Sequence, residues 1–493
     1  MKRFVKFYLT LIVAFLFSTA TFSQENNDEN DLIKGMHSIS SYELMEFVEE
    51  LCSEKYGGRL TGTAEYDSAA QWVANKFQTW GLAPLGDEGS YFQEFLNPYT
   101  KVTGEGKVTL HMDTDGDKIY KYYDYISEYM PGSTSDSGEV SAEVVYVGYG
   151  ITAPDLNYDD YKNVDVEGKI ILLEPEAPLN PEDDPEEFKK WEPYSRHKYK
   201  LQNAAKHGAI GMLYNYGPLA NPNNDYIKDF IYSHVGDSVV NDLFLGTGKD
   251  YENTIARLKK NLKPQSFNTG KTVTIENHTQ HYPDGEGSNV IGFIEGSDPD
   301  LKDEAIVVGA HLDHVGYCHE RIPGANDNAS GVSVLMGVAK ALQQADISLK
   351  RSVVFLAFGA EEQGIVGSKI YIENPAFPVD KTIAFLNIDG VGVGDKFGAV
   401  AGKNYPDIYE MVVEANENYI HRDIQASEYL NVTRPRLDAV RFMTEGIPSL
   451  SFYTYGKQSP YHRPGDVPSL IEPQTMGDMS QMIYFSVINL SNK

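Results

Sequence analysis

The chain has 493 residues, of which 41% are hydrophobic and 12% aromatic, so it can build two domains or one large domain with an insertion. Its formal net charge of −29 argues against nucleic acid and anionic membranes as partners. Two cysteines are too few for a disulfide framework in a chain of this size, and we expect Cys52 and Cys318 to be free rather than bridged.

The N-terminus has the pattern of an export signal. Three basic residues precede an apolar run at 7–17, and small residues surround a cleavage point before Gln24. The apolar run is shorter than the roughly 20 residues that a membrane-spanning helix needs. We therefore expect residues 1–23 to be a signal peptide and the mature protein to be exported, to the periplasm or the extracellular space, without a membrane anchor.

Residues 31–82 predict two amphipathic helices separated by a glycine-rich loop. The first has Ser41 as its candidate N-cap, and the second ends near Gly81.

A different pattern begins near residue 97. Short alternating strands dominate, with turns rich in Gly, Pro and Asp, and we expect one helix, around 198–207. This segment has no cluster of metal-ligand residues. We interpret 24–96 as the first part of the main domain, 97–287 as an inserted β-rich domain, and 288–493 as the second part of the main domain.

From residue 288 onward, apolar strands alternate with helices. This order is typical of an α/β fold with a mixed, largely parallel sheet flanked by helices. The expected strands are 289–294, 305–310, 352–358, 383–388 and 449–453. Because these strands are rich in Val, Ile and Phe, we expect both of their faces to be buried.

Acids and histidines follow the ends of these strands, where open α/β sheets bind ligands. Singly, each could be a surface residue or part of a turn. Together they would crowd repelling carboxylates into one cleft, a cost that divalent cations remove. The residues concerned are His311, Asp313, Asp327, Glu361, Glu362, Asp389 and His462.

The ligand types restrict the metal. Imidazole with carboxylate, and no thiolate, favours zinc, cobalt or manganese over iron–sulfur or copper(I). There are more acids than one zinc needs, and two metals bridged by one carboxylate would use them all.

The motifs occur in a recognisable order: His-x-Asp at 311–313, Asn-Asp-Asn-x-Ser-Gly at 326–331, Glu-Glu at 361–362, Asp-Gly at 389–390 and Tyr-His at 461–462. As a set they resemble the co-catalytic zinc aminopeptidases of clan MH, metallopeptidase family twenty-eight. The resemblance covers 57–82 and most of 288–490. It implies a zinc-exopeptidase fold and two Zn²⁺ ions per chain.

By that resemblance, His311 and Asp389 would hold one zinc, Glu362 and His462 the other, and Asp327 would bridge them.

The resemblance also assigns roles around the metals. Asp313 would fix the ring of His311, and Glu361 would be the general base on the attacking water. Tyr461 would help to stabilise the tetrahedral oxyanion, although packing is an equal alternative for this residue.

The inserted segment resembles a protease-associated domain through 145–151, 167–173 and 204–209. Such insertions shape substrate access, and scaffolding or dimer contact is the open alternative.

One stretch departs from the family pattern of Ser-Asp-His before a Phe. Here Asp438 and Phe442 match, whereas the Ser and His are replaced and Arg434 and Arg436 bring positive charge. Asp438 and Arg436 are candidate substrate contacts, and pairing of the arginines with acids is the simpler alternative.

The resemblance implies an exported aminopeptidase that acts on peptides. A carboxypeptidase of the glutamate carboxypeptidase type and a glutaminyl cyclase share the fold, and the insertion counts against the cyclase. A non-catalytic, receptor-like binding protein would have lost metal ligands, and none is lost here. The oligomeric state stays open.

Overall fold

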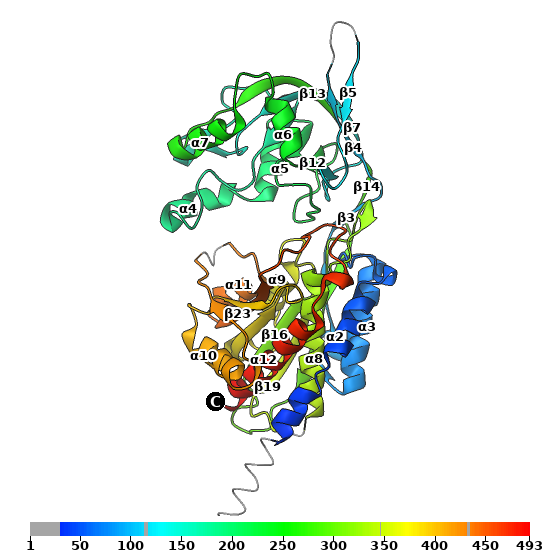
Figure 1. The fold of residues 1–493 in the computed structure, drawn as a ribbon, viewed down its shortest axis with the longest axis vertical. Coiled ribbons are helices and arrows are strands. Elements are labelled where there is room, and N and C mark those ends of the chain that lie inside the picture. The colour runs from blue at the N-terminus through cyan, green and yellow to red at the C-terminus, as the bar shows by residue number, and fades with distance from the viewer. Residues whose placement is uncertain (1–29, 113–116, 346, 431–433) are drawn as a thin grey trace, which may run out of the picture.

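The computed structural model describes residues 30–112, 117–345, 347–430 and 434–493, so the predicted signal peptide lies outside the described residues. Figure 1 shows two lobes, one above the other. We call residues 103–278 the inserted lobe and the remaining described residues the α/β lobe. Within the described ranges, no helix combines the length and apolar character needed to cross a bilayer.

The α/β lobe is built on a nine-stranded mixed sheet, as the sequence predicts. Its four central strands, β19, β16, β20 and β23, are parallel, and antiparallel strands flank them. In spatial order the sheet contains β1 (Ala83–Pro84), β15 (Glu286–Ile294), β19 (Ser352–Phe358), β16 (Ala305–His311), β20 (Thr382–Ile388), β23 (Ser449–Tyr455), β21 (Lys396–Val400) and β22 (Ile424–Ala426), with β2 (Phe92–Leu96) beside β15.

Helices cover both faces of this sheet (Figure 1). One face carries α2 (Ser41–Leu51), α3 (Ala64–Trp80), α8 (Ser330–Gln344), α10 (Pro406–Ala415) and α12 (Pro473–Asn492). The other carries α9 (Val366–Glu373) and α11 (Asp438–Thr444). Helix α2 is capped by Ser40, whose Oγ accepts the Glu43 N–H, so the predicted cap at Ser41 is wrong by one residue.

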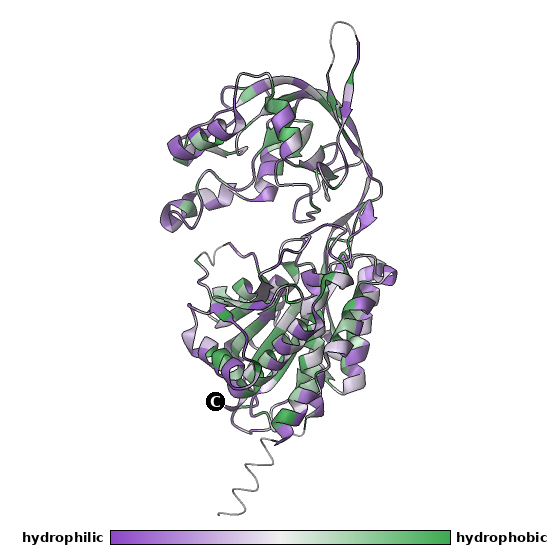
Figure 2. Ribbon diagram, in the orientation of Figure 1, coloured by the Kyte–Doolittle hydropathy of each residue, from purple (hydrophilic) through white to green (hydrophobic). Residues whose placement is uncertain are grey.

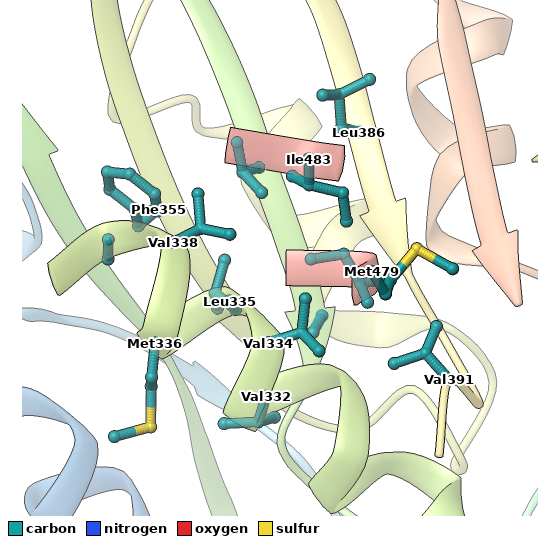
Figure 3. Packing of buried hydrophobic residues seen from close by; sticks show 14 of the residues in the cluster. Val332, Val334, Leu335, Met336, Val338, Phe355, Leu386, Val391, Met479 and Ile483 are labelled. Carbon is teal, nitrogen blue, oxygen red and sulfur yellow. The ribbon is translucent and has the colours of Figure 1, made fainter. Parts of the chain in front are cut away.

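The core between α8, α12 and the sheet makes the strand ends rigid. In Figure 3, Leu335 and Val338 of α8 face Phe355 of β19, and Ile483 of α12 lies near Leu386 of β20. All five side chains are fully buried. Burial of one such side chain contributes roughly 1.5–3 kcal/mol, so the strands that carry the site are firmly held. Figure 2 shows the same concentration of hydrophobic residues along the central strands.

The inserted lobe contains an eight-stranded sheet with four parallel central strands, β7, β10, β11 and β12. Its strands are β5 (Tyr120–Tyr122), β4 (Lys107–His111), β13 (Phe267–Asn277), β7 (Gly138–Tyr146), β10 (Ile170–Leu173), β11 (Gly211–Tyr214), β12 (Ile231–Val235) and β6 (Tyr129–Pro131).

This lobe has more helix than the sequence predicts. The expected helix is α5 (His197–Lys206), and α4 (Pro185–Trp191), α6 (Asp237–Phe244) and α7 (Tyr251–Asn261) accompany it. The expectation of a single helix is therefore wrong. Helices α4 and α6 are short, with seven and eight residues, and α6 buries only one apolar side against its sheet.

A small sheet joins the two lobes. The chain enters the inserted lobe after β3 (Tyr99–Val102) and leaves it before β14 (Thr279–Tyr282), and these two strands pair antiparallel. Strands β17 (Tyr317–Cys318) and β18 (Glu320–Arg321) of the α/β lobe extend the same sheet. Cys318 and Cys52 are buried free thiols, which confirms the expectation that they are not bridged.

Candidate metal centre

His311 is the last residue of β16 and lies at the carboxyl end of the parallel strands. Its Nε2 is 3.3 Å from Asp327 Oδ1 and 3.4 Å from Asp389 Oδ1. Asp389 directly follows β20, the neighbouring strand, so the strand register brings His311 and Asp389 together.

Asp313 is fully buried and supports two parts of the site. Its backbone carbonyl lies 3.2 Å from His311 Nδ1, whereas its carboxylate is 3.8 Å from that atom. The carboxylate instead accepts the backbone N–H groups of Glu361 and Glu362, at 3.0 and 3.1 Å. Asp313 therefore contacts the His311 ring through its backbone and fixes the Glu361–Glu362 turn through its side chain.

A second group of side chains surrounds Glu362. His462 Nε2 lies 2.9 Å from Glu362 Oε2 and 3.4 Å from Asp327 Oδ2. On the other side, His314 Nδ1 lies 2.9 Å from Glu362 Oε1. His314 was not among the predicted site residues, although it stands directly beside the His-x-Asp motif.

Asp327 belongs to both groups. One carboxylate oxygen faces His311 and the other faces His462. The ligand atoms of His314, Asp327, Glu362 and His462 lie within 4.8 Å of one another, and so do those of His311, Asp327 and Asp389. This is the position that a bridging carboxylate requires.

Two residues outside the predicted site, Asp466 and Arg59, hold its loops in place. Asp466 accepts the backbone N–H groups of Asn326 and Asp327 at 3.0 and 3.1 Å. The buried guanidinium of Arg59 donates to the carbonyls of Leu312, at 2.8 Å, and Gly324, at 2.9 Å. Both contacts connect segments far apart in the sequence.

The electrostatics of the site call for a cation. Burial acts to lower the pKa of His462, but Glu362 and Asp327 raise it to about 10. For Glu361, in contrast, burial raises the pKa well above its usual range, and the nearby carboxylate of Asp438 adds to the shift. The acids here are too crowded to be charged together unless protons or metal ions compensate them.

The donor set fits zinc. Imidazole and carboxylate without thiolate are zinc ligands, and in each group the ligand atoms lie within 4.8 Å of one another. His462 Nε2 makes no well-formed hydrogen bond, although an oxygen of Glu362 is 2.9 Å away. A buried nitrogen directed between two carboxylates in this way is suited to bind a metal ion.

The other predicted site residues lie around this centre. Asp438 is buried at the start of α11, and burial raises its pKa to about 6. Among the residues that the structure describes, neither of its oxygens has a hydrogen-bond partner. Tyr461 is 54% exposed, and its ring stacks on His462 with 3.7 Å between centroids.

Arg436 pairs with Glu176 of the inserted lobe. Arg434 Nη1 contacts the second oxygen of the same carboxylate at 2.6 Å. Both guanidinium groups therefore form ion pairs with Glu176. This agrees with the simpler of the two alternatives, in which the arginines pair with acids and do not contact substrate.

The model of peptidase family M28 matches residues 289–487. Leupeptin-inactivating enzyme 1 of Streptomyces exfoliatus is 34% identical over 25% of this chain and 26% of its own length. An aminopeptidase of Pseudomonas aeruginosa is 25% identical over 81% of this chain and 67% of its own length. The chain spans less than half of several of its curated relatives, including 45% of aminopeptidase YwaD of Bacillus subtilis.

Solved structures support the fold over almost the whole chain. The aminopeptidase from Aneurinibacillus sp. strain AM-1 superposes with a TM-score of 0.65 and 20% identity, over 92% of this chain and 94% of that one. A zinc aminopeptidase from Bacillus subtilis gives a TM-score of 0.61 and 18% identity, over 92% and 95%. The part of the chain that resembles the model of peptidase family M28 is thus the part of the α/β lobe that carries the metal centre.

Proposed function

We propose that the protein is an exported, zinc-dependent aminopeptidase that removes N-terminal residues from peptides. The observation that carries this proposal is the position of Asp327, whose two oxygens face His311 and His462 in two donor groups. The match of residues 289–487 to the M28 family model and the relatives that are named aminopeptidases support it.

Two zinc ions would use all five ligands that the sequence predicts. His311 and Asp389 would hold one, Glu362 and His462 the other, and Asp327 would bridge them. When bound, zinc polarises a carbonyl group and lowers the pKa of water to about 7.

The chain's own residues supply the proton transfers. Glu361 is the general base, taking a proton from the attacking water and delivering it to the leaving amine. Asp313 holds the backbone of the Glu361–Glu362 turn, so the base and its neighbour keep fixed positions. Tyr461 stands at the exposed edge of the centre, beside His462, where its hydroxyl can stabilise the oxyanion.

The charges around the site favour a substrate with a free amine. Two zinc ions bring four positive charges, and Asp327, Glu362 and Asp389 return three negative ones. Glu361 and the unpartnered Asp438 then make the cleft negative, which attracts the α-ammonium group of a peptide. A carboxypeptidase needs a cation for the substrate carboxylate, and Arg434 and Arg436 are both paired with Glu176.

The test compares one peptide in three forms: free, N-acetylated and C-amidated. We expect the purified protein to cleave the free and amidated peptides and to leave the acetylated peptide largely intact. Preference for the acetylated form, or dependence on a free C-terminal carboxylate, would indicate a carboxypeptidase. Formation of pyroglutamate from an N-terminal Gln without peptide-bond hydrolysis would indicate a cyclase.

Residues 97–287 are proposed to be a protease-associated insertion, and residues 1–23 a cleaved signal. Its removal predicts that the mature protein begins at Gln24. N-terminal sequencing of protein recovered from outside the cytoplasm tests this, and an intact Met1 would contradict it.

A further inference from the structure

A loop of the inserted lobe contacts the residue that carries one end of the metal centre. Ala220 lies between β11 and β12, far in sequence from His462. Its carbonyl oxygen is 2.6 Å from His462 Nδ1, which donates to it. The Ala220 N–H in turn donates to the carbonyl of His462, over 3.1 Å.

A second contact beside it involves Arg463, whose Nε donates to the carbonyl of Pro218 at 3.0 Å. His462 itself has a φ of +53°, in the left-handed region that residues other than glycine rarely adopt. Such a conformation persists where the surroundings impose it. The loop at 218–220 supplies three hydrogen bonds at this point.

The loop is itself held from two sides. Ala220 is fully buried in a cluster with Val315 and Cys318 of the α/β lobe and Met130 of the inserted lobe. The neighbouring Asn221 N–H donates to Ser133 Oγ at 3.0 Å. The carbonyl that accepts from His462 therefore has a position fixed by packing.

We propose that the inserted lobe is a positioning element of the metal centre, acting through Ala220 and Pro218 on His462. A proton on Nδ1, shared with the Ala220 carbonyl, leaves the lone pair on Nε2, which lies 2.9 Å from Glu362 and 3.4 Å from Asp327. Outer partners of this kind fix the tautomer and orientation of metal-binding histidines, and losing one costs about 10–100-fold in metal affinity. The inference rests on the proposed function, because it takes His462 as a zinc ligand.

The first experiment moves the carbonyl by overpacking. Ala220→Val adds two methyl groups inside the buried cluster and is expected to displace the loop from His462. Ala209→Val is the matched control, because Ala209 is buried in the core of the inserted lobe and belongs to a different cluster. Zinc affinity of the full-length protein is measured by competition with a chelator.

The second experiment removes a side-chain contact. Arg463→Met keeps most of the side-chain length but donates no hydrogen bond to Pro218, whereas Arg463→Lys keeps a donor and serves as the conservative rescue. Cobalt replaces zinc in a parallel series, because its visible absorption reports the geometry of the ligands. A general loss of stability would not by itself change that spectrum.

We expect Ala220→Val and Arg463→Met to bind one of two metal ions about 10–100-fold more weakly and to alter the cobalt spectrum. Ala209→Val and Arg463→Lys should resemble the wild type. If the wild type binds two ions and both loss variants bind them with unchanged affinity and spectrum, the inference is wrong and the proposed function stands. A wild type that binds no metal through His462 would overturn the proposed function, and the inference with it.

Discussion

Both lobes bury acids near the ends of strands, but the side chains that contact these acids differ between the lobes. In the inserted lobe, Glu174 directly follows β10, and its Oε2 accepts from Asn215 Nδ2 at 2.7 Å and from Tyr251 Oη at 3.0 Å. Asp160 accepts from the Ile151 N–H and from Tyr158 Oη at 3.0 and 2.9 Å. The donors that contact these two acids are neutral, and among the described residues Glu174 Oε1 has no hydrogen-bond partner.

In the α/β lobe, the carboxylates of Asp327, Glu362 and Asp389 contact histidines instead. Burial raises the pKa of both Glu174 and Asp160 to about 7, so those acids can remain neutral without a metal. A buried acid at a strand end is thus no metal ligand by itself. What distinguishes the centre is that its acids face imidazoles and one another.

The largest expected difference concerns the general base. If Glu361 is the general base as proposed, Glu361→Gln should keep the bound metal and the fold but lower kcat by about 10²–10⁴-fold, because the side chain can no longer accept a proton. Glu174→Gln, the same change in the inserted lobe, should leave kcat unchanged. Steady-state kinetics and metal analysis of the two variants make the comparison.

Glu362→Gln should behave differently from its neighbour and weaken metal binding. If Glu362→Gln kept its metals and lost turnover while Glu361→Gln lost metal, the base and the ligand would have to be exchanged.

Metal removal should lower the stability of the α/β lobe, whose acids need a cation, more than that of the inserted lobe. A chelator leaves the acids of the α/β lobe uncompensated, and we expect a lower Tm and loss of activity, both restored by zinc. A ligand at about 1,000 times its Kd stabilises a fold by about 4 kcal/mol. Calorimetry with and without chelator checks this, and an unchanged Tm would count against a structural contribution of the metals.

A smaller effect is expected at His314, which contacts Glu362 through Nδ1 and whose Nε2 has no hydrogen-bond partner within the described part of the chain. His314→Asn places an amide donor near the position of Nδ1, whereas His314→Ala removes it. We expect the Ala variant to bind one metal ion about 10–100-fold more weakly, and the Asn variant to recover part of the loss.

Equal zinc affinity in wild type and His314→Ala, measured by chelator competition, would show that Glu362 needs no support from this ring.

The smallest effect is a pH dependence in the inserted lobe. Burial, the largest cause, raises the pKa of Glu174 from 4.5 to about 7. Between these values the unfolded chain loses its proton while the folded chain keeps it, so the contribution of Glu174 to stability is complete below pH 4.5 and lost as pH rises to about 7. The upper bound is about 3 kcal/mol.

Glu174→Gln lacks this titration. Relative to wild type, its Tm should therefore improve as pH rises from about 5 to 8, which a series of thermal melts would detect. A Tm difference that does not change with pH would contradict the raised pKa.

Much of the α/β lobe could be predicted from the sequence, because its central strands are continuous apolar runs. The predicted strand 305–310 is β16, Ala305–His311, almost to the residue. The inserted lobe was harder. Helix α6 has eight residues and only four buried side chains, too short a pattern to separate from the surrounding strands.

The residues of the candidate site likewise fall into those that could be predicted from the sequence and those that could not. Residues inside local motifs, such as His311 and Glu362, could be assigned from the sequence. Arg59 and Asp466 could not, because they act on backbone groups of distant segments. The Ala220 carbonyl could not either, since every residue carries one and only the fold decides which of them meets an imidazole.

The strand pairs at the base of the inserted lobe also bear on how the chain folds. Strand β2 pairs with β15, and about 190 residues separate Leu96 from Glu286, so closing that loop in an unfolded chain costs on the order of 5 kcal/mol of entropy. The inserted lobe has hydrophobic cores of its own, and its ends emerge side by side on β3 and β14. If the inserted lobe folds first, its adjacent ends hold β2 and β15 close together, so this pair can close at an entropic cost similar to that of a hairpin.

Ala209→Val, in one of the cores of the inserted lobe, should then slow refolding of the distant nine-stranded sheet in stopped-flow experiments. An unchanged rate would mean that the sheet assembles independently.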